Sequence, residues 1–367
     1  IFPDFLPVEN SSVVLPDFFS YPQWFSQRFF QCFTGLFPLI NKFTPPTTVK
    51  TNIFYIFLYL MNVSQERKLS TTMKLTFQKT ALLNGINIVL KAVPSKTTMP
   101  ILECILIDAS TDEIKLTAND MELGIETKVE GDILEKGKIA LDAKLFSEIA
   151  RKLSDSDSLV PIESDEKFNT VITCENSVFK IQGKDGEEFS YLPYIERNKN
   201  ITLSQFSLKE VIRQTIFSIS DNENTKLMTG ELFEVKDNVL KVVGLDGHRI
   251  AIRNINLSGN ADDVKVVVPG KTLNEISKIL SSDAESVVNI YFTNNHILFE
   301  FDQTMVVSRL IEGEYFRIDQ MLSSDYETKL KINKKEFLDC IDRATLFVKE
   351  GDKKPIILNI EDSKMSL

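Results

Sequence analysis

The stretch Leu75-Thr-Phe-Gln-Lys-Thr-Ala-Leu-Leu83 reads as a short strand followed by an amphipathic helix, and the same plan returns twice along the chain. The later copies are Phe206-Ser-Leu-Lys-Glu-Val-Ile212 and Ile332-Asn-Lys-Lys-Glu-Phe-Leu338. After each copy the pattern predicts a polar loop and then a strand, over 99–102, 227–233 and 354–358. The spacing from Pro100 to Leu227 is 127 positions. A repeat of this length is a whole domain and not a solenoid unit.

Each of the first two repeats also contains a second amphipathic helix, about 64 residues after the first. It is predicted over 142–153 in the first repeat and over 270–280 in the second. Alternating runs joined by tight turns, such as 113–118, have the period of a half-buried antiparallel sheet. The chain is therefore predicted to be α+β, with two helices per domain packed on antiparallel sheets.

Composition excludes several classes of protein. The 367 residues include 42 Lys and Arg against 52 Asp and Glu, for a formal net charge of −10, which is the wrong sign for wrapping DNA by bulk charge. A hydrophobic content of 43% with 14 Gly and 13 Pro excludes a collagen, a wholly disordered chain and a multi-span membrane protein. The cysteines form no CxxC pair, so reduced thiols in a cytoplasmic protein are expected rather than disulfides or a thiolate metal site. They are Cys32, Cys104, Cys174 and Cys340.

Residues 1–72 differ from the rest of the chain, because they hold 12 of the 26 Phe and the single Trp and lack a helical or strand period. The apolar run Ile53-Phe-Tyr-Ile-Phe-Leu-Tyr-Leu-Met61 is about half as long as a membrane-spanning helix; an interfacial anchor is one alternative for it. We interpret 1–72 as an atypical extension, disordered or not native, with Met73 as the natural start.

Cationic side chains recur on helix faces opposite the apolar stripes. In 142–153, Leu145, Ile149 and Leu153 form the predicted buried stripe, while Lys144 and Arg151 lie seven residues apart on another face. Such charges are usually solvated, and Glu148 and Glu275 are interleaved with them, but their recurrence predicts a basic surface within an acidic protein. The equivalent cations on the other helices are Lys271 and Lys278, Lys209 and Arg213, and Lys334, Lys335 and Arg343.

The sequence contains no catalytic motif, and its two histidines are His248 and His296. The cluster Asp246-Gly247-His248-Arg249 invites three interpretations. In the first, Asp246 and His248 serve a hydrolase or transferase. In the second, the cluster only caps a sheet edge as a hairpin turn. In the third, it forms an apolar docking patch with a polar rim, together with Met228, Leu245 and Ile250. The docking patch is favoured over catalysis.

The order of several motifs makes residues 73–367 resemble the bacterial DNA polymerase III beta subunit, the sliding clamp. The motifs are Met73-Lys-Leu-Thr-Phe, Met99-Pro-Ile-Leu102, Leu245-Asp-Gly-His-Arg-Ile-Ala251, Val267-Val-Pro-Gly-Lys271 and Ser308-Arg-Leu-Ile-Glu-Gly-Glu314. The resemblance implies the DNA-clamp fold, with domains at 73–198 and 199–326 and a truncated third domain at 327–367.

The resemblance also implies a function without chemistry. Head-to-tail homodimers of this family form a ring that encircles double-stranded DNA independently of sequence and tethers the replicative polymerase. Expected partners are the DNA polymerase III alpha subunit, an ATP-using clamp loader, and other clamp-binding polymerases and repair proteins. No cofactor, metal, catalytic residue or membrane is expected. Because the third domain is short, residues 1–367 are predicted to be monomeric, and the homodimer is expected of a full-length chain.

Carried over by position, the family's DNA contacts add Lys96, Asn222 and Lys226 to the cations of the helices. The partner-peptide cleft would use the docking patch together with Gly247 and Met321. One departure concerns the segment Tyr315-Phe316-Arg317-Ile318, where the family usually has a Pro and a Tyr. The predicted DNA-binding residues are therefore Lys96, Lys144, Arg151, Lys209, Arg213, Asn222, Lys226, Lys271, Lys278 and Arg343. The cleft set is Met228, Leu245, Gly247, His248, Arg249, Ile250 and Met321.

Overall fold

The computed structural model describes residues 73–153, 158–259, 261–322, 325–346, 348, 355–361 and 364–367. The described chain divides into two compact units, one of residues up to 194 with 300–307 and one of residues 195–299 with 308–367. The expectations for residues 1–72 lie outside the described ranges. No helix within those ranges is long and apolar enough to cross a membrane.

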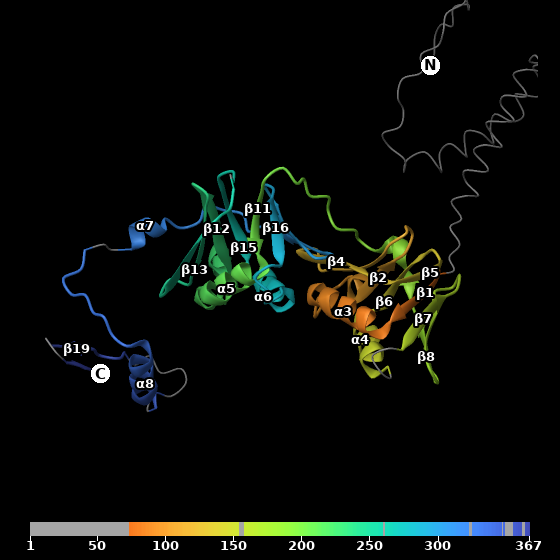
Figure 1. Cartoon of the computed structure of the whole chain (residues 1–367), viewed down its shortest axis with the longest axis horizontal. Coiled ribbons are helices and arrows are strands. Elements are labelled where there is room, and N and C mark those ends of the chain that lie inside the picture. Colours follow the sequence, from red (N-terminus) through yellow and green to blue (C-terminus); the bar gives the residue numbers. More distant parts are fainter. Residues whose placement is uncertain are drawn as a thin grey trace, which may run out of the picture. The chain divides into compact units, whose positions relative to one another are not determined.

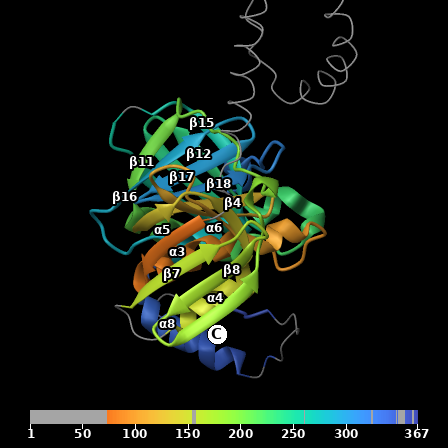
Figure 2. The ribbon, with the colours of Figure 1, turned by 90° about the vertical axis from the view of Figure 1, so that its right-hand side faces the viewer.

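The first unit is built from antiparallel strands with two helices on them (Figure 1). One sheet has the order β5-β1-β7-β8-β9, and a second contains the run β10-β6-β2-β3-β4. Figure 2 shows β7 and β8 side by side, as their pairing requires. The strands are β1 (Met73–Gln78), β2 (Cys104–Asp108), β3 (Ile114–Asn119), β4 (Leu123–Val129), β5 (Gly131–Glu135), β6 (Lys138–Asp142), β7 (Leu159–Ser164), β8 (Asn169–Cys174), β9 (Ser177–Gln182) and β10 (Lys184–Asp185). The helices are α3 (Lys79–Val89) and α4 (Ala143–Lys152), with 3₁₀ segments η1 (Leu90–Ala92), η2 (Pro100–Glu103) and η3 (Gly186–Glu188).

The second unit repeats this construction. One sheet has the order β14-β13-β12-β15, and another contains the run β17-β16-β11. Helices α5 and α6 lie side by side beneath β12, β13 and β15 (Figure 1). The strands are β11 (Asn200–Ser204), β12 (Gly230–Lys236), β13 (Val239–Leu245), β14 (Ile250–Asn256), β15 (Val264–Pro269) and β16 (Val287–Phe292). They are followed by β17 (His296–Phe301) and β18 (Thr304–Arg309), of which residues 300–307 are assigned to the first unit. The helices are α5 (Gln205–Thr215), α6 (Gly270–Ile279) and α7 (Ile318–Met321), with η4 (Ile216–Ser218) and η5 (Glu223–Thr229).

Equivalent hydrogen bonds join equivalent elements in the two units. The backbone N–H of Lys79 at the start of α3 donates to the Ser158 carbonyl at 3.1 Å. The N–H of Gln205 at the start of α5 donates to the Ser286 carbonyl at 2.7 Å. The α+β class predicted from the repeat is confirmed.

Two of the predicted strand starts are wrong. Residues 99–102 fall largely in the 3₁₀ segment η2, and the strand begins at Cys104. In the second repeat η5 runs to Thr229, and the strand begins at Gly230. Pro100 explains the first error, because proline cannot donate to a strand ladder and is favoured at the first position of a helical turn, where it lies here.

The predicted buried stripe of the second helix is wrong at one position. Leu145 is 44% exposed, whereas Phe146 is fully buried. The buried face of α4 is centred between Phe146, Ala150 and Leu153, so Leu145 lies beyond its edge. The corresponding apolar residues at α6, Leu273, Ile276 and Leu280, are all buried.

The third repeat opens with helix α8 (Lys334–Thr345), whose Asn333 side chain accepts from the N–H groups of Lys335 and Glu336. No strand is present among the described residues directly before α8, contrary to the predicted strand-and-helix plan. Residues 355–358 are not a strand either; the short strands β19 (Asn359–Ile360) and β20 (Met365–Ser366) follow them.

Candidate peptide cleft and basic helix faces

The turn at Asp246 joins β13 to β14, and the carboxylate of Asp246 itself stabilises it. One carboxylate oxygen of Asp246 accepts from the backbone N–H groups of His248 at 2.9 Å and Arg249 at 3.1 Å. The other oxygen accepts from Arg249 Nε at 2.8 Å. Gly247 has a φ of +90°, a backbone conformation that glycine adopts without strain. The predicted hairpin is confirmed, with Gly247 and His248 as its central residues.

Apolar side chains from β12, β13, β15 and the segment after β18 gather next to this turn. The buried members of this cluster are Leu232, Val243, Leu245, Val267, Tyr315 and Ile318. Partly buried apolar side chains pack around it: Leu227, Met228, Ile250, Ile252, Ile311 and Phe316. We call the two sets together the cleft cluster. It brings Met228, Leu245 and Ile250 together, as the sequence predicted.

The other predicted cleft residues lie at the rim or beyond it. Gly247, His248 and Arg249 are exposed on the turn. The guanidinium of Arg249 lies 5.8 Å from the centre of the Phe217 ring, a cation–π distance. Met321, at the end of α7, is 51% exposed and does not belong to the cleft cluster.

Residues 311–318, which include the segment 315–318 that departs from the family pattern, close the cluster. The Tyr315 hydroxyl donates to the Val243 carbonyl at 3.2 Å, and the Ile311 N–H donates to the Val267 carbonyl at 2.9 Å. A cavity of about 270 Å³ lies between this segment, β15 and Asn294. Gly313, in the Glu-Gly motif of this segment, has a φ of +135° and fixes how the segment enters the cluster.

The geometry of Asp246 does not fit the catalytic alternative. Its carboxylate binds the backbone of His248, not the imidazole, and both oxygens are occupied by the turn. The backbone N–H of His248 is the main cause that holds the pKa of Asp246 below its ordinary value, with Arg249 adding to it. A carboxylate stabilised in its charged form is a weak base. Within the described residues no three His, Cys, Asp or Glu side chains are grouped to hold a metal.

Glu231 is an unexpected feature of the same unit. Its side chain is fully buried in β12, and within the described residues neither carboxyl oxygen has a hydrogen-bond partner. Burial raises the pKa of Glu231 to about 8, although the nearby Thr215 hydroxyl offsets part of the rise. The carboxyl group is therefore mostly neutral at pH 7.

The predicted DNA-binding residues differ in the partners that their side chains have. Lys96, Lys144, Arg151 and Lys226 are exposed, and in the described part of the chain their charged groups make no ion pair. Arg213 instead makes a two-pronged contact with Glu210 at 2.7 and 2.8 Å, and Lys278 pairs with Glu275 at 2.6 Å. Lys271 is exposed, Arg343 donates to the Cys340 sulfur at 3.1 Å, and the Asn222 side chain caps η5.

Lys209 has a contact that the sequence pattern did not predict. Its ammonium donates to the Leu280 carbonyl at 3.0 Å and to the Ser282 hydroxyl at 3.2 Å. In the first unit the ammonium of Lys79 likewise donates to the carbonyl of Leu153. In both units, a lysine on the first helix donates a hydrogen bond to a backbone carbonyl at the end of the second helix. Lys209 therefore ties α5 to α6.

Two family models match the chain. The DNA polymerase III beta subunit N-terminal domain matches residues 73–193, and the central domain matches residues 202–316. A beta sliding clamp of Staphylococcus epidermidis is 35% identical over 303 residues, which are 80% of this chain and 80% of the relative.

Solved structures agree with these matches. A DNA polymerase III beta subunit of Eubacterium rectale is 69% identical with a TM-score of 0.77, covering 80% of this chain and 79% of that one. The sliding clamp of Bacillus subtilis is 37% identical with a TM-score of 0.73, covering 76% and 75%. The resemblance seen in the sequence is confirmed: this chain belongs to the DNA polymerase III beta subunit family, the bacterial sliding clamps, which are accessory subunits and not enzymes.

Proposed function

We propose that this chain is a DNA polymerase processivity clamp that holds its partners through the cleft cluster. The observation that carries the proposal is a preformed set of apolar side chains beside a rigid, polar turn. An apolar groove with a fixed polar rim binds a short peptide at low entropic cost, because neither side of the groove has to be ordered on binding. Met228 and Ile250 supply apolar contact, and Arg249, held by Asp246, supplies a cationic rim.

Fluorescence anisotropy with a labelled peptide from the DNA polymerase III alpha subunit tests the cleft. We expect Met228→Ala and Arg249→Ala each to weaken binding about tenfold, as truncation of a central contact does. Lys236→Ala, on the exposed end of β12, is the matched control and should leave the affinity unchanged. Equal affinities for all four proteins would refute the cleft.

The exposed cations of the helices support DNA binding. Lys144 and Arg151 share one face of α4 and lack an ion-pair partner among the described residues. Cations of this kind attract phosphate, and a sliding protein benefits from a few weak contacts more than from a tight grip. We give Arg213, Lys271, Lys278 and Arg343 the same role, together with Lys96, Asn222 and Lys226 in the loops, and assign Lys209 a structural role.

Duplex DNA binding measured against salt concentration tests the α4 face. The double variant Lys144→Gln, Arg151→Gln should reduce the slope of log affinity against log salt by about 2, since each phosphate contact contributes about 0.9. Lys152→Gln, a neighbouring exposed lysine, is the control for unspecific charge loss. A double variant with the slope of the unmodified protein would remove α4 from the DNA-binding surface.

The assembly that follows from this function is a ring in a cytoplasmic replication complex, opened by a clamp loader. The open edge of β9 supports pairing with another chain, because β9 is the last strand of its sheet and its Val178 is 57% exposed. Domains at 73–198, 199–326 and 327–367 belong to this proposal. Light scattering tests the homodimer expected of a full-length chain, and Val178→Lys should weaken that dimer.

A further inference from the structure

The turn between β3 and β4 in the first unit has the construction of the Asp246 turn. One carboxylate oxygen of Asp120 accepts from the backbone N–H groups of Glu122 at 3.0 Å and Leu123 at 2.6 Å. The N–H of Asp120 donates to the Leu123 carbonyl, as that of Asp246 does to the Arg249 carbonyl. Met121 therefore occupies the position of Gly247, with a φ of +75° against +90°.

A segment of the first unit also covers its sheet as residues 311–318 cover the second. We call residues 186–194 the first-unit strap. Its Phe189 is 2% exposed and packs in a cluster with Leu106 and Ala140, a cross-strand pair. Tyr315 is also 2% exposed and packs with the pair Leu232 and Val267.

The strap links the 3₁₀ segment η2 to the Asp120 turn. Ile101 of η2 packs against the Phe189 cluster. The Asn119 side chain at the turn donates to the Ser190 carbonyl at 3.3 Å, and Leu192 fills the space above Gly124. Three elements that form the cleft of the second unit therefore meet again in the first: a 3₁₀ segment, an aspartate-capped turn and a strap.

Apolar side chains are left exposed on this frame. Met99 is 44% exposed, Met121 58% and Tyr194 85%. A φ of +75° is unfavourable for methionine by about 1 kcal/mol, and an exposed side chain there gains no burial in return. The strain at Met121 places a flexible apolar side chain at the tip of the turn, where a partner can reach it.

We propose that the η2 segment, the Asp120 turn and the first-unit strap form a second peptide-docking surface, which takes an apolar segment flanked by Lys or Arg. The inference rests on the proposed function of the cleft, whose frame it repeats. The two turns differ in charge: the first carries Asp120 and Glu122 where the second carries Asp246 with His248 and Arg249.

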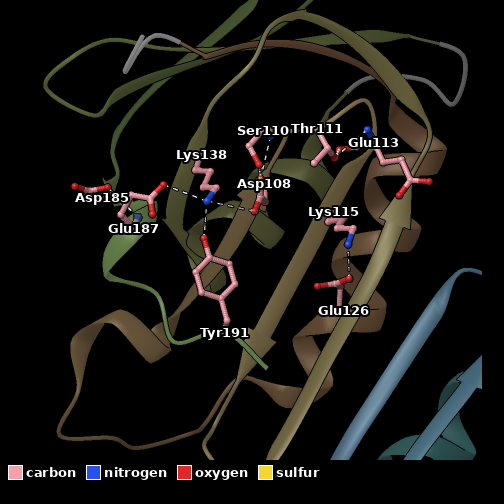
Figure 3. A network of polar contacts seen from close by, with 10 residues as sticks. All are labelled: Asp108, Ser110, Thr111, Glu113, Lys115, Glu126, Lys138, Asp185, Glu187 and Tyr191. Carbon is pink, nitrogen blue, oxygen red and sulfur yellow. Dashed lines mark hydrogen bonds and ion pairs between the residues drawn. The ribbon is translucent and has the colours of Figure 1, made fainter. Parts of the chain in front are cut away.

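The neighbouring lysines do not reverse the acidic character of this surface. Lys138 is held between Glu187 at 3.1 Å, Asp108 at 3.8 Å and the Tyr191 hydroxyl at 2.7 Å (Figure 3). Lys184 donates to the Pro100 carbonyl at 2.6 Å. Two further carboxylates at the frame, those of Glu103 and Glu188, are on exposed residues. Charge complementarity therefore selects a basic-flanked peptide here, whereas the Arg249 rim favours a neutral or acidic one.

Two labelled peptides test this surface: one with Leu-Phe-Leu between lysine pairs and one with the same core between glutamate pairs. We expect the basic peptide to bind the whole chain more tightly than the acidic one. Met121→Gly, which relieves the strain and removes the side chain, should weaken binding of the basic peptide at least fivefold, and Glu122→Lys should do the same. Equal binding of both peptides, or an unchanged affinity in both variants, overturns the proposal.

The alpha subunit peptide, measured in parallel, separates this inference from the proposed function. Met121→Gly should leave its affinity unchanged, and Met228→Ala should weaken it while leaving the basic peptide bound. If the basic peptide responds to Met228→Ala instead, it occupies the cleft and the second surface does not exist. Failure of the alpha subunit peptide to bind would refute the proposed function and leave the basic-peptide result to stand alone.

Discussion

Replacing Glu231 should change how the stability of this protein depends on pH. The carboxyl group is fully buried in β12 without a hydrogen-bond partner in the described chain, and its pKa is raised from 4.5 to about 8. A folded-state pKa above the unfolded one means that the folded state favours the neutral acid. The stability that the neutral Glu231 carboxyl retains for the folded protein is therefore fully present below pH 4.5 and is lost as the pH rises through 8.

The size of the effect follows from that difference. Each pH unit between the two pKa values corresponds to about 1.4 kcal/mol, so about 3 kcal/mol is lost at pH 7 and about 5 kcal/mol at pH 8 and above. Glu231→Gln cannot ionise and should not show this loss, although its buried amide remains unpartnered. Glu231→Met also removes the polar atoms and should be the most stable of the three proteins at pH 8.5.

Urea unfolding followed by circular dichroism at pH 5.5, 7 and 8.5 measures the difference. The gap in unfolding free energy between Glu231→Gln and the unmodified chain should widen by several kcal/mol over this range. Glu234→Gln is the matched control, since Glu234 lies on the other face of β12 between Lys241 and Lys265. Curves for Glu231→Gln and the unmodified chain that stay parallel from pH 5.5 to 8.5 would refute a neutral buried carboxyl.

Three further outcomes are expected. Lys209→Met should lower the unfolding free energy by about 1 kcal/mol, through the lost bonds to the end of α6, and leave the salt slope of DNA binding unchanged. Lys144→Gln should instead leave the unfolding free energy unchanged and reduce the salt slope. A Lys209→Met protein with unchanged stability and weakened DNA binding would contradict the structural role. Asp246→Ala should weaken alpha subunit peptide binding as much as Arg249→Ala does, because the turn and the guanidinium lose their anchor; anisotropy with full affinity would show that the rim needs no anchor. Tyr315→Phe should cost about 1 kcal/mol in urea unfolding through the lost hydroxyl bond, and an unchanged midpoint would show that bond to be dispensable.

The sequence determined the features that depend on neighbouring residues. The opening helix of each repeat could be predicted because its apolar residues recur at helical spacing within a short segment. The Asp246 turn could be predicted because Asp and Gly favour that local conformation. The cleft residues Leu245 and Ile250 could be predicted because they flank this turn, and Met228 was assigned to the cleft by the resemblance to the family. The same local signals placed Lys144 and Arg151 on one exposed face of α4.

The tertiary structure decided what distant residues do to one another. Lys209 and Lys144 look alike in sequence, but the carbonyl of Leu280, 71 positions from Lys209, accepts a hydrogen bond from the Lys209 ammonium. One lysine is therefore tied to the end of α6, and the other is left to solvent. The burial of Glu231 and the exposure of Leu145 likewise follow from how helices cover a sheet, which no short pattern encodes. The spacing of apolar residues in the sequence predicts which side of a helix or strand a residue occupies. The charge state and the partners of that residue depend on what the fold packs against that side.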